Sequence, residues 1–387
     1  MELEVAKRLQ RTEEYYFSKK LREIDEMNRN GAQVINLGIG SPDLPPHPEV
    51  IKTLQEQAAL ATTHGYQNYK GAPALRQAMA DWYARYYRVT INPNTEILPL
   101  IGSKEGIVHI CMTYLQEGDQ ALIPNPGYPA YTSAVTITGA TPVTYELSPE
   151  NNWMPDLEEL EKTDLSAVKL MWINYPHMPT GTLASPELFQ KIIEFGRKHE
   201  ILICHDNPYS FILNDNPKSI MEVPNAMDIA IELNSLSKSS NMAGWRIGML
   251  IANEKRIAQI MKFKSNMDSG MFLPMQLAAA KALSLDKEWY TQLNQEYRIR
   301  RNKVFEIMDL LNCSYDINQV GLFVWAKIPS GFENSYQLCD DVLYKAHVFI
   351  TPGGIFGTAG EQFIRISLCA KVEVYELAIE RIRKSLV

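Results

Sequence analysis

Hydrophobic and polar positions near the N-terminus recur at helical spacing and predict a helix over residues 17–29. Four apolar side chains define one face of it, and Gly31 follows its end: Phe17, Leu21, Ile24 and Met27. This spacing is typical of an amphipathic helix that ends before a glycine. The next passage, INLGIGSPDLPPHPEV, is rich in proline and glycine, so we expect an extended connection there.

From about residue 95 onward, short apolar runs alternate with helix-like segments. The runs read ILPLI, ALIP, VKLMWI, ILICHD, IAIEL and IGMLIA. This alternation is typical of βα units that build a mostly parallel sheet covered by helices on both faces. We expect a long helical stretch from about 272 to 309, and then a smaller α+β unit with two or three strands. Ligands of such sheets bind beyond the carboxyl ends of the strands, so chemistry is expected in the loops that follow the runs.

Composition places the 387-residue chain among globular proteins and argues against several functions. Apolar residues make up 45% and the net charge is −7, without a run of lysine or arginine, so nucleic-acid binding is not expected. No apolar stretch approaches the ~20 residues that span a bilayer, and the charged N-terminus lacks a signal core. The five scattered cysteines lack a CxxC pair and the seven histidines lack metal spacing. We therefore expect a cytoplasmic protein with free buried thiols, structural histidines, no metal and no membrane contact.

Polar or aromatic residues follow five of the apolar runs. The loops read GSKEGI, NPGYPAY, NYPHMPTG, HDNPYSF and LSKSSNMAGWRIG. The first is a turn that enters a helix, where backbone N–H groups and the helix dipole suit a phosphate, with Ser103 and Lys104 nearest. Arg246 adds a fork of cationic donors for phosphate oxygens.

The remaining residues of these loops suit the ring of a cofactor. Tyr128 offers a face for stacking on an aromatic ring. Lys238 can form an imine with an aldehyde if desolvation or positive charge lowers its pKa. Asp206 can hold a protonated pyridine nitrogen. Together these roles are the requirements of pyridoxal 5'-phosphate (PLP).

Taken singly, each residue also has an ordinary structural explanation. A lysine in a serine-rich loop is usually a solvated charge, and an aspartate often caps a turn. Tyr128 and Tyr131 could be core aromatics, and Arg365 in the strand-like run FIRISL would usually face solvent. The joint order of these residues along the chain favours the cofactor site over this set of separate explanations.

Over nearly its whole length the chain resembles the class I/II aminotransferases of fold type I. The resemblance is carried by LGIGSPD, HGYQNYKGAPALRQA, GSKEG, NPGYPAY, DNPY, SLSKSSNMAGWRIG, and TPGGIFG followed by FIRISLC. The most specific piece sets Ser235, Lys238 and Arg246 at the family's −3, 0 and +8 spacing. The resemblance implies an α/β fold with a large domain, whose mostly parallel seven-stranded sheet lies between helices, and a smaller α+β domain built from both termini. We expect residues 1–45 and 286–387 in the small domain and 46–285 in the large PLP-binding domain.

The resemblance also implies a role for each site residue. Lys238 would be the PLP lysine and general base, with Asp206 and Tyr209 as its catalytic companions. Substrate would contact Ile39, Gly40 and Arg365, the last through the α-carboxylate. The cofactor would contact a larger set, with Tyr66 reaching the phosphate of the partner in an obligate homodimer: Ser103, Lys104, Tyr128, Asn174, Asp206, Tyr209, Ser235, Ser237, Lys238, Arg246 and Tyr66.

One residue departs from the family pattern. Met178 stands where the family's NPTG motif has an asparagine that donates to the cofactor ring oxygen, and methionine cannot donate this hydrogen bond. We expect Tyr209 to carry that role, alone or with a water or Asn174, and the ring oxygen to bind protons more readily.

The implied reaction is a ping-pong transfer of an amino group between an L-amino acid and a 2-oxo acid. The segment KSNMDSGMFLPMQ lacks the arginine of dicarboxylate-specific relatives, so we expect a neutral, alanine-like or other apolar substrate, with glutamate and 2-oxoglutarate as the second pair. The same segment resembles the alanine and diaminopimelate aminotransferase branches, which leaves a long polar substrate open. A PLP-dependent C–S β-lyase and a non-catalytic PLP-binding protein on the same fold are the two alternatives.

Overall fold

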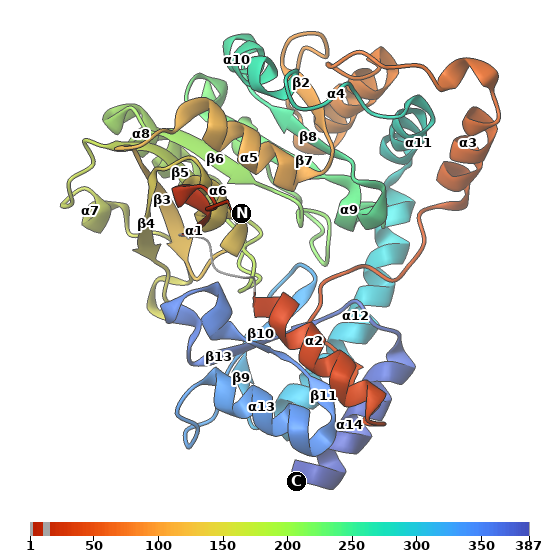
Figure 1. Ribbon diagram of the computed structural model, residues 1–387, viewed down its shortest axis with the longest axis vertical. Helices are drawn as coiled ribbons and strands as arrows, with labels where there is room; N and C mark the ends of the chain where they lie inside the picture. Colours follow the sequence, from red (N-terminus) through yellow and green to blue (C-terminus); the bar gives the residue numbers. More distant parts are fainter. Residues whose placement is uncertain (1–2, 11–15, 387) are drawn as a thin grey trace.

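Two sheets set the architecture of the chain, in a computed structural model that describes residues 3–10 and 16–386. A seven-stranded sheet occupies the upper part of Figure 1, and a four-stranded sheet occupies the lower part. The large sheet has the order β2-β8-β7-β6-β5-β3-β4, with β8 antiparallel to both neighbours and the other neighbouring pairs parallel. Its strands are β2 (Ile97–Leu100), β3 (Gln120–Asn125), β4 (Thr141–Glu146), β5 (Val168–Asn174), β6 (Leu202–Asp206), β7 (Ala230–Ser235) and β8 (Gly248–Ile251).

The six apolar runs form six of these strands, which confirms the predicted α/β fold. The sequence analysis missed β4, because this strand lies at the edge of the sheet and most of its side chains are exposed or half-buried. An edge strand of this kind lacks the continuous apolar run of a strand buried on both faces.

Helices cover both faces of the large sheet, and successive residues of each strand point to opposite faces. On β6, Ile203 packs in one apolar cluster and Cys204 in another. The cluster of Ile203 includes side chains of α3 (Pro48–Ala58), α4 (Pro73–Tyr87), α7 (Leu157–Leu160), α8 (Pro186–His199) and α11 (Leu273–Ser284). The cluster of Cys204 includes α5 (Ser103–Tyr114), α6 (Pro129–Ile137) and α10 (Glu254–Lys264).

Both ends of the chain build the smaller unit. Its sheet has the order β12-β13-β10-β9, and β1 pairs in parallel with β11 beside it. The strands are β1 (Ile35–Asn36), β9 (Ser314–Tyr315), β10 (Phe323–Lys327), β11 (Val348–Phe349), β12 (Thr351–Pro352) and β13 (Phe363–Ser367). Helices α2 (Tyr16–Arg29), α12 (Lys287–Leu310), α13 (Ser335–Ala346) and α14 (Val372–Leu386) surround it (Figure 1). Helix α1 (Lys7–Gln10) precedes α2.

Two sequence expectations for the C-terminal half were wrong in detail. The predicted helix over about 272–309 is two helices, α11 and α12, because the chain turns at Leu285 and Asp286 caps α12 by accepting from the Glu288 N–H. Five short strands, β9 to β13, replace the expected two or three. The expected helix over 17–29 is confirmed by α2, and the first turn of α3 ends the extended connection at Pro48.

Helix α12 packs against both apolar cores. Tyr290 belongs to the large apolar cluster, whereas Leu293 belongs to the cluster of the small sheet. The helix therefore ties the two units together. The domain limits at 45 and 285 stay a prediction.

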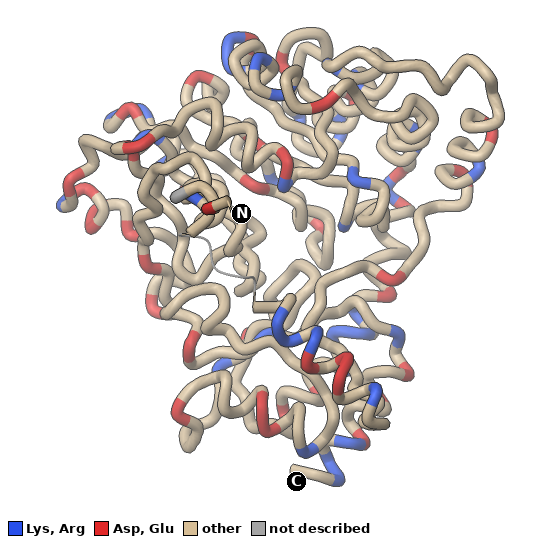
Figure 2. Tube along the Cα trace, in the orientation of Figure 1, with Lys and Arg blue, Asp and Glu red and all other residues tan. Residues whose placement is uncertain are grey.

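Surface properties agree with the composition. Basic and acidic residues are mixed along the tube in Figure 2. Among the described residues, no helix combines the length and apolar character that a membrane span requires. All five cysteines are free thiols, and Cys369 is the least buried of them.

Candidate active site

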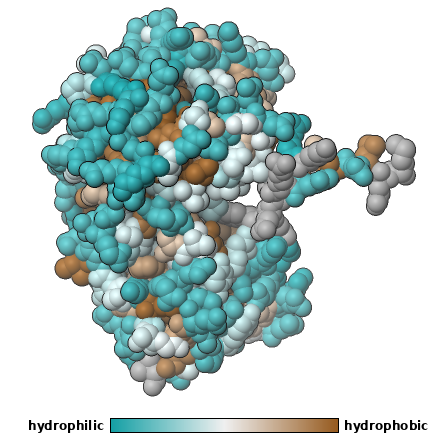
Figure 3. All heavy atoms as spheres, turned by 90° about the vertical axis from the view of Figure 1, so that its left-hand side faces the viewer, coloured by the Kyte–Doolittle hydropathy of each residue, from teal (hydrophilic) through white to brown (hydrophobic). Residues whose placement is uncertain are grey.

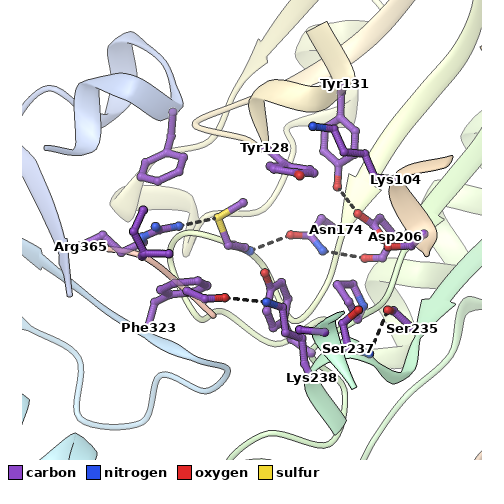
Figure 4. Close-up of a pocket in the computed structure, with 18 of the residues that line it drawn as sticks. Lys104, Tyr128, Tyr131, Asn174, Asp206, Ser235, Ser237, Lys238, Phe323 and Arg365 are labelled. Carbon is purple, nitrogen blue, oxygen red and sulfur yellow. Dashed lines mark hydrogen bonds between the residues drawn. The ribbon is translucent and has the colours of Figure 1, made fainter. Parts of the chain in front are cut away.

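A cavity of about 340 Å³ lies where the carboxyl ends of β5, β6 and β7 face the small sheet (Figure 4). Residues from both units line it. Every predicted site residue except Tyr66 is among them: Ile39, Gly40, Ser103, Lys104, Tyr128, Asn174, Asp206, Tyr209, Ser235, Ser237, Lys238, Arg246 and Arg365. The structure therefore brings together residues that are up to 326 positions apart in the sequence, from Ile39 to Arg365. The role of each one stays a prediction.

Lys238 reaches the cavity from the short helix α9 (Leu236–Ser239), which directly follows β7. Ser235, the last residue of β7, caps this helix by accepting a hydrogen bond from the Ser237 N–H at 3.1 Å. Nζ of Lys238 donates to the Gly40 carbonyl at 2.6 Å (Figure 4). Burial lowers the pKa of Lys238; nearby Arg365 and Arg246 lower it further, while Cys369 opposes them. A lowered pKa raises the fraction of neutral amine, which is the nucleophilic and basic form.

The turn before α5 is suited to binding an anion. Gly102 precedes the helix with φ +81°, and a Cβ on it would overlap Nη2 of Arg246. A glycine is therefore needed here both for the backbone angle and for the close passage of the guanidinium. Ser103 and Lys104 begin the helix, whose N-terminal N–H groups favour an anion. This arrangement fits a phosphate group.

An ion-pair cluster lies behind this turn. The almost fully buried Lys264 ammonium contacts Glu105 at 3.2 Å and also contacts Asp268, and His109 lies 2.9 Å from Glu105. Burial would raise the pKa of Glu105, but His109 and Lys264 lower it to about 2. Although Glu105, His109 and Asp268 are close enough to share a metal ion, an ammonium already pairs with both carboxylates. The cluster thus anchors α5.

Asp206 is the last residue of β6 and lies in the cavity floor at 4% exposure. Oδ2 accepts from the Tyr131 hydroxyl at 2.9 Å, whereas Oδ1 has no hydrogen-bond partner among the described residues. Burial raises the pKa of Asp206 to about 6, although the Tyr131 hydrogen bond and His205 oppose the rise. A buried carboxylate oxygen without a donor fits a protonated ring nitrogen, which is what PLP would bring here.

Two tyrosines flank the position that a planar ring would take. Tyr128 immediately precedes α6, and its ring lies edge-on to Tyr131 with centroids 5.6 Å apart. Burial raises the pKa of Tyr209, so its hydroxyl keeps its proton and can donate a hydrogen bond. The site can therefore supply both a stacking face and a donor to a ring oxygen.

Both polar groups of the Asn174 side chain form hydrogen bonds with the backbone, so Asn174 does not replace the asparagine that the family has at position 178. The Asn174 side chain donates to the Asp206 carbonyl at 2.6 Å and accepts from the Met178 N–H at 2.8 Å. The Met178 sulfur faces Nη1 of Arg365 at 3.3 Å (Figure 4). Tyr209 thus remains the side chain expected to donate to the ring oxygen.

Arg365 lies at 5% exposure on β13, which excludes the alternative explanation that it is a solvent-facing residue of this strand. Its guanidinium carbon is 3.8 Å from the Phe323 ring centroid and 4.5 Å from that of Phe356, and Phe17 lies at 6.0 Å. Nη2 donates to the Gly38 carbonyl at 3.0 Å. The aromatic faces stabilise the buried Arg365 guanidinium in the apolar wall of the cavity, where it can bind a carboxylate.

Sequence reasoning gave no site role to four aromatic residues that line this cavity, Phe17, Tyr131, Phe323 and Phe356, or to Pro208 and Ala243. Tyr131 had a detectable signal, because it follows Tyr128 by three positions at a helix start, where side chains three apart share one side. The phenylalanines gave no such signal, since their alignment around Arg365 depends on three separate segments meeting.

Tyr66 lies outside this cavity and is 94% exposed. A single chain therefore does not bring it to its own phosphate site. Its expected role in a partner's site stays a prediction.

Comparison with known proteins gives a consistent result. The family described as "Aminotransferase class I and II" matches residues 32–382. The LL-diaminopimelate aminotransferase of Dehalococcoides mccartyi strain CBDB1 is 40% identical over 382 residues, covering 98% of each chain. That of Gloeobacter violaceus is also 40% identical, over 98% of this chain and 97% of its own.

Solved structures agree with the fold. The apo structure of BacF from Bacillus subtilis superposes with a TM-score of 0.95 at 38% identity, covering 99% of this chain and 98% of the other. An aspartate aminotransferase mutant from Thermus thermophilus has a TM-score of 0.91 at 21% identity over 99% and 100% of the chains, which supports the fold alone.

Replacing Gly102 tests the anion site. We expect Gly102→Ala to displace Arg246 and weaken PLP binding by about tenfold to a hundredfold, since a charge-assisted hydrogen bond contributes about 1.5–3 kcal/mol. The dissociation constant can be measured by fluorescence or absorbance titration of the apoprotein. Gly118→Ala is the matched control, because Gly118 has φ +93° but open space around its Cβ position. Equal PLP affinity in both variants would contradict the assignment.

The stability of the apoprotein should depend on Asp206. Its pKa rises from 3.8 to about 6 on folding, so the folded state binds this proton more readily and loses stability as pH rises through this range. Relative to Asp206→Asn, we expect the wild-type free energy of unfolding to fall by about 1 kcal/mol between pH 5 and 7. Urea denaturation at both pH values measures it, with the exposed Asp81→Asn as control. Parallel profiles for wild type and Asp206→Asn would show that Asp206 is not the buried acid described.

Proposed function

The chain belongs to the class I and II aminotransferases, and we propose that it transfers the amino group of a neutral, apolar L-amino acid, with glutamate and 2-oxoglutarate as the second pair. Members of this family use PLP, and the cavity fits it as described above. The observation that carries the substrate proposal is the distribution of charge in the cavity wall.

The cavity wall contains four basic side chains, and each has an assigned task. Arg246 and Lys104 lie at the phosphate turn, Lys238 reaches toward the cofactor aldehyde, and Arg365 takes the α-carboxylate. The remaining wall beside Arg365 is apolar: Phe17, Ile39, Phe323 and Phe356. A side-chain carboxylate buried against this wall without a cation of its own would lose hydration without compensation, so the wall favours an uncharged side chain in the first pair. The longer side chain of the glutamate pair would have to carry its distal carboxylate past this wall.

Bound PLP supplies an aldehyde for the substrate amino group and an electron-withdrawing ring for its α-carbon. Arg365 and the Gly38–Gly40 backbone would hold the substrate carboxylate side and so fix the orientation of the α-carbon. Nζ of Lys238 would then take the proton from the α-carbon and return it to the cofactor side. Asp206 Oδ1 would hold the ring nitrogen proton, and Tyr209 would donate to the ring oxygen.

The names of the relatives support a second candidate substrate. At 40% identity over almost the full length, LL-diaminopimelate aminotransferases make a long substrate with a distal carboxylate and amine the main competitor. Such a substrate would require polar groups beyond the apolar wall, for example from a second subunit. Family membership favours transamination over the C–S β-lyase and the non-catalytic alternative.

A homodimer is supported by exposed apolar groups on two parts of the chain. Segments 60–69 and 267–272 lie against each other, since the rings of His64 and Phe272 are 5.6 Å apart, and they expose Leu60, Tyr66, Tyr69, Met267 and Phe272. Leu3, Val5 and Leu9 near the N-terminus are also exposed; helix α1 contacts α6, and Figure 3 shows the chain projecting from the body beyond it. A second copy of the chain would cover these groups. Tyr66 would then reach the partner's phosphate site.

A substrate screen tests the proposed specificity. With 2-oxoglutarate as acceptor, we expect kcat/KM for apolar L-amino acids to exceed that for aspartate by at least about tenfold, because an unpaired buried carboxylate costs more than about 1.4 kcal/mol. Lys238→Ala supplies the background rate. A preference for LL-diaminopimelate or aspartate would overturn the apolar assignment, and ammonia with pyruvate from cystathionine would indicate the lyase.

Hybrid dimers test whether Tyr66 acts across the interface. Lys238→Ala and Tyr66→Ala subunits are each expected to be impaired alone. In a mixed dimer one site would combine the intact Lys238 with the intact Tyr66 of the other subunit, so refolding the two together should recover activity. Mixing Lys238→Ala with Lys238→Arg is the control. No recovery, in a mixture shown to contain hybrid dimers, would contradict a role in trans.

A further inference from the structure

A buried histidine and a buried glutamate lie on the opposite face of the large sheet from the cavity. His205 directly precedes Asp206 on β6, so its side chain points to the other face. Glu232 is its cross-strand neighbour on β7. Both side chains are completely buried, yet neither lines the cavity, so the roles assigned above do not explain them.

Hydrogen bonding determines where the protons of this pair lie. Nε2 of His205 faces the Tyr175 carbonyl at 2.9 Å, and because a carbonyl can only accept, Nε2 must carry a proton. Nδ1 faces Oε2 of Glu232 at 2.8 Å. If Glu232 is ionised, Nδ1 must also carry a proton, which makes His205 an imidazolium.

The surroundings of Glu232 favour its ionised form. The Tyr83 hydroxyl donates to Oε1 at 2.6 Å. The Ser219 hydroxyl lies 2.9 Å from both oxygens, and the Ile220 N–H donates to Oε2 at 3.1 Å. Three donors to one carboxylate stabilise the anion in a dry environment. The Phe189 ring, whose centroid lies 5.0 Å from that of His205, and Ile173, its cross-strand neighbour on β5, are both uncharged.

The resulting positive charge lies on the residue next to Asp206 in β6, with its side chain on the opposite face of the sheet. The imidazolium belongs to the adjacent residue, whereas Glu232 lies beyond it on β7. On the cavity face, Asp206 receives one hydrogen bond, from Tyr131, and burial acts against its ionisation. Charges this deeply buried are screened very little by salt. An imidazolium at this position therefore offsets part of the burial penalty of Asp206.

We propose that His205 and Glu232 form a positioning pair, in which Glu232 keeps His205 protonated and the imidazolium keeps Asp206 ionised to hold the ring nitrogen proton of bound PLP. The proposal rests on the role given to Asp206 under the proposed function. Neither residue lines the cavity, so both would act through Asp206 rather than by touching the cofactor or the substrate. Their effect is on the position of one proton, between Asp206 Oδ1 and the ring nitrogen. The nitrogen is the favoured position because the imidazolium belongs to the residue adjacent to Asp206, whereas Glu232 lies on the next strand.

Glu232→Gln tests this directly. The amide preserves the shape of the carboxylate and can donate to Nδ1 of a neutral His205, so the pair loses its charge separation but keeps the hydrogen bond between its two members; the Ile220 N–H loses its acceptor. We expect the ratio of protonated to unprotonated ring nitrogen to fall by about tenfold, the equivalent of one pKa unit. The readout is the ¹⁵N chemical shift of ring-labelled PLP bound to the dimeric or monomeric holoenzyme, followed over pH without substrate.

Two further variants separate this effect from a general loss of stability. His205→Gln removes the imidazolium while leaving Glu232, and it should shift the ¹⁵N signal in the same direction by at least as much. It also serves as the test should Glu232→Gln fail to fold. Tyr145→Phe is the matched control, because it removes another buried hydrogen bond, to the Trp172 carbonyl, from the same face of the sheet. It should leave the ¹⁵N shift unchanged.

The outcomes distinguish this inference from the proposed function. A protonated ring nitrogen in the wild type that stays equally protonated in Glu232→Gln and His205→Gln would overturn the positioning pair and leave the role of Asp206 standing. An unprotonated ring nitrogen in the wild type would overturn both. A shift of the same size in Tyr145→Phe would show that the effect is a structural one and would also overturn the pair.

Discussion

The active cavity depends on keeping a lysine amine and an aspartate carboxylate buried together without an ion pair for either. Among the described residues, neither Lys238 nor Asp206 takes part in a salt bridge. Buried ionisable groups without partners are costly, and they shift toward their neutral forms. The pKa of Lys238 is lowered and that of Asp206 raised, as this predicts. One molecule of PLP would satisfy both groups at once, since it brings an aldehyde to the amine and a protonated nitrogen to the carboxylate.

The fold explains how these two groups come to face one ligand. Parallel strands β6 and β7 end at the same edge of the sheet, with Asp206 and Ser235 as their last residues. The small unit then closes this edge, because the Gly40 carbonyl accepts a hydrogen bond from Nζ of Lys238 and Arg365 lies across the cavity on β13. Helix α12, whose Tyr290 and Leu293 pack in different cores, joins the two units. The groups proposed to be catalytic thus lie at the strand ends or just beyond them, while those proposed to hold the substrate come from the other unit.

The sequence predicted the parts of the site that are local to strand ends. Lys238, Asp206 and Arg246 follow recognisable apolar runs, and their order along the chain was informative. Residues whose importance arises from long-range packing were missed. The aromatic faces around Arg365 come from Phe17, Phe323 and Phe356, and the histidines were all read as structural because one sequence does not show that His205 lies against Glu232. The edge strand β4 was missed because it lacks a continuous apolar run, and the break between α11 and α12 because it depends on one turn at Leu285 and the Asp286 cap.

The central claim is that Lys238 carries the cofactor. Reduction of the PLP-loaded enzyme with borohydride, followed by proteolysis and mass spectrometry, locates the lysine bound to PLP. The account predicts a single phosphopyridoxyl modification on the peptide that contains Lys238, and none in Lys238→Ala. Modification of a different lysine, such as Lys104 in the same cavity, or the absence of any modified peptide from a coloured, PLP-loaded enzyme, would contradict it.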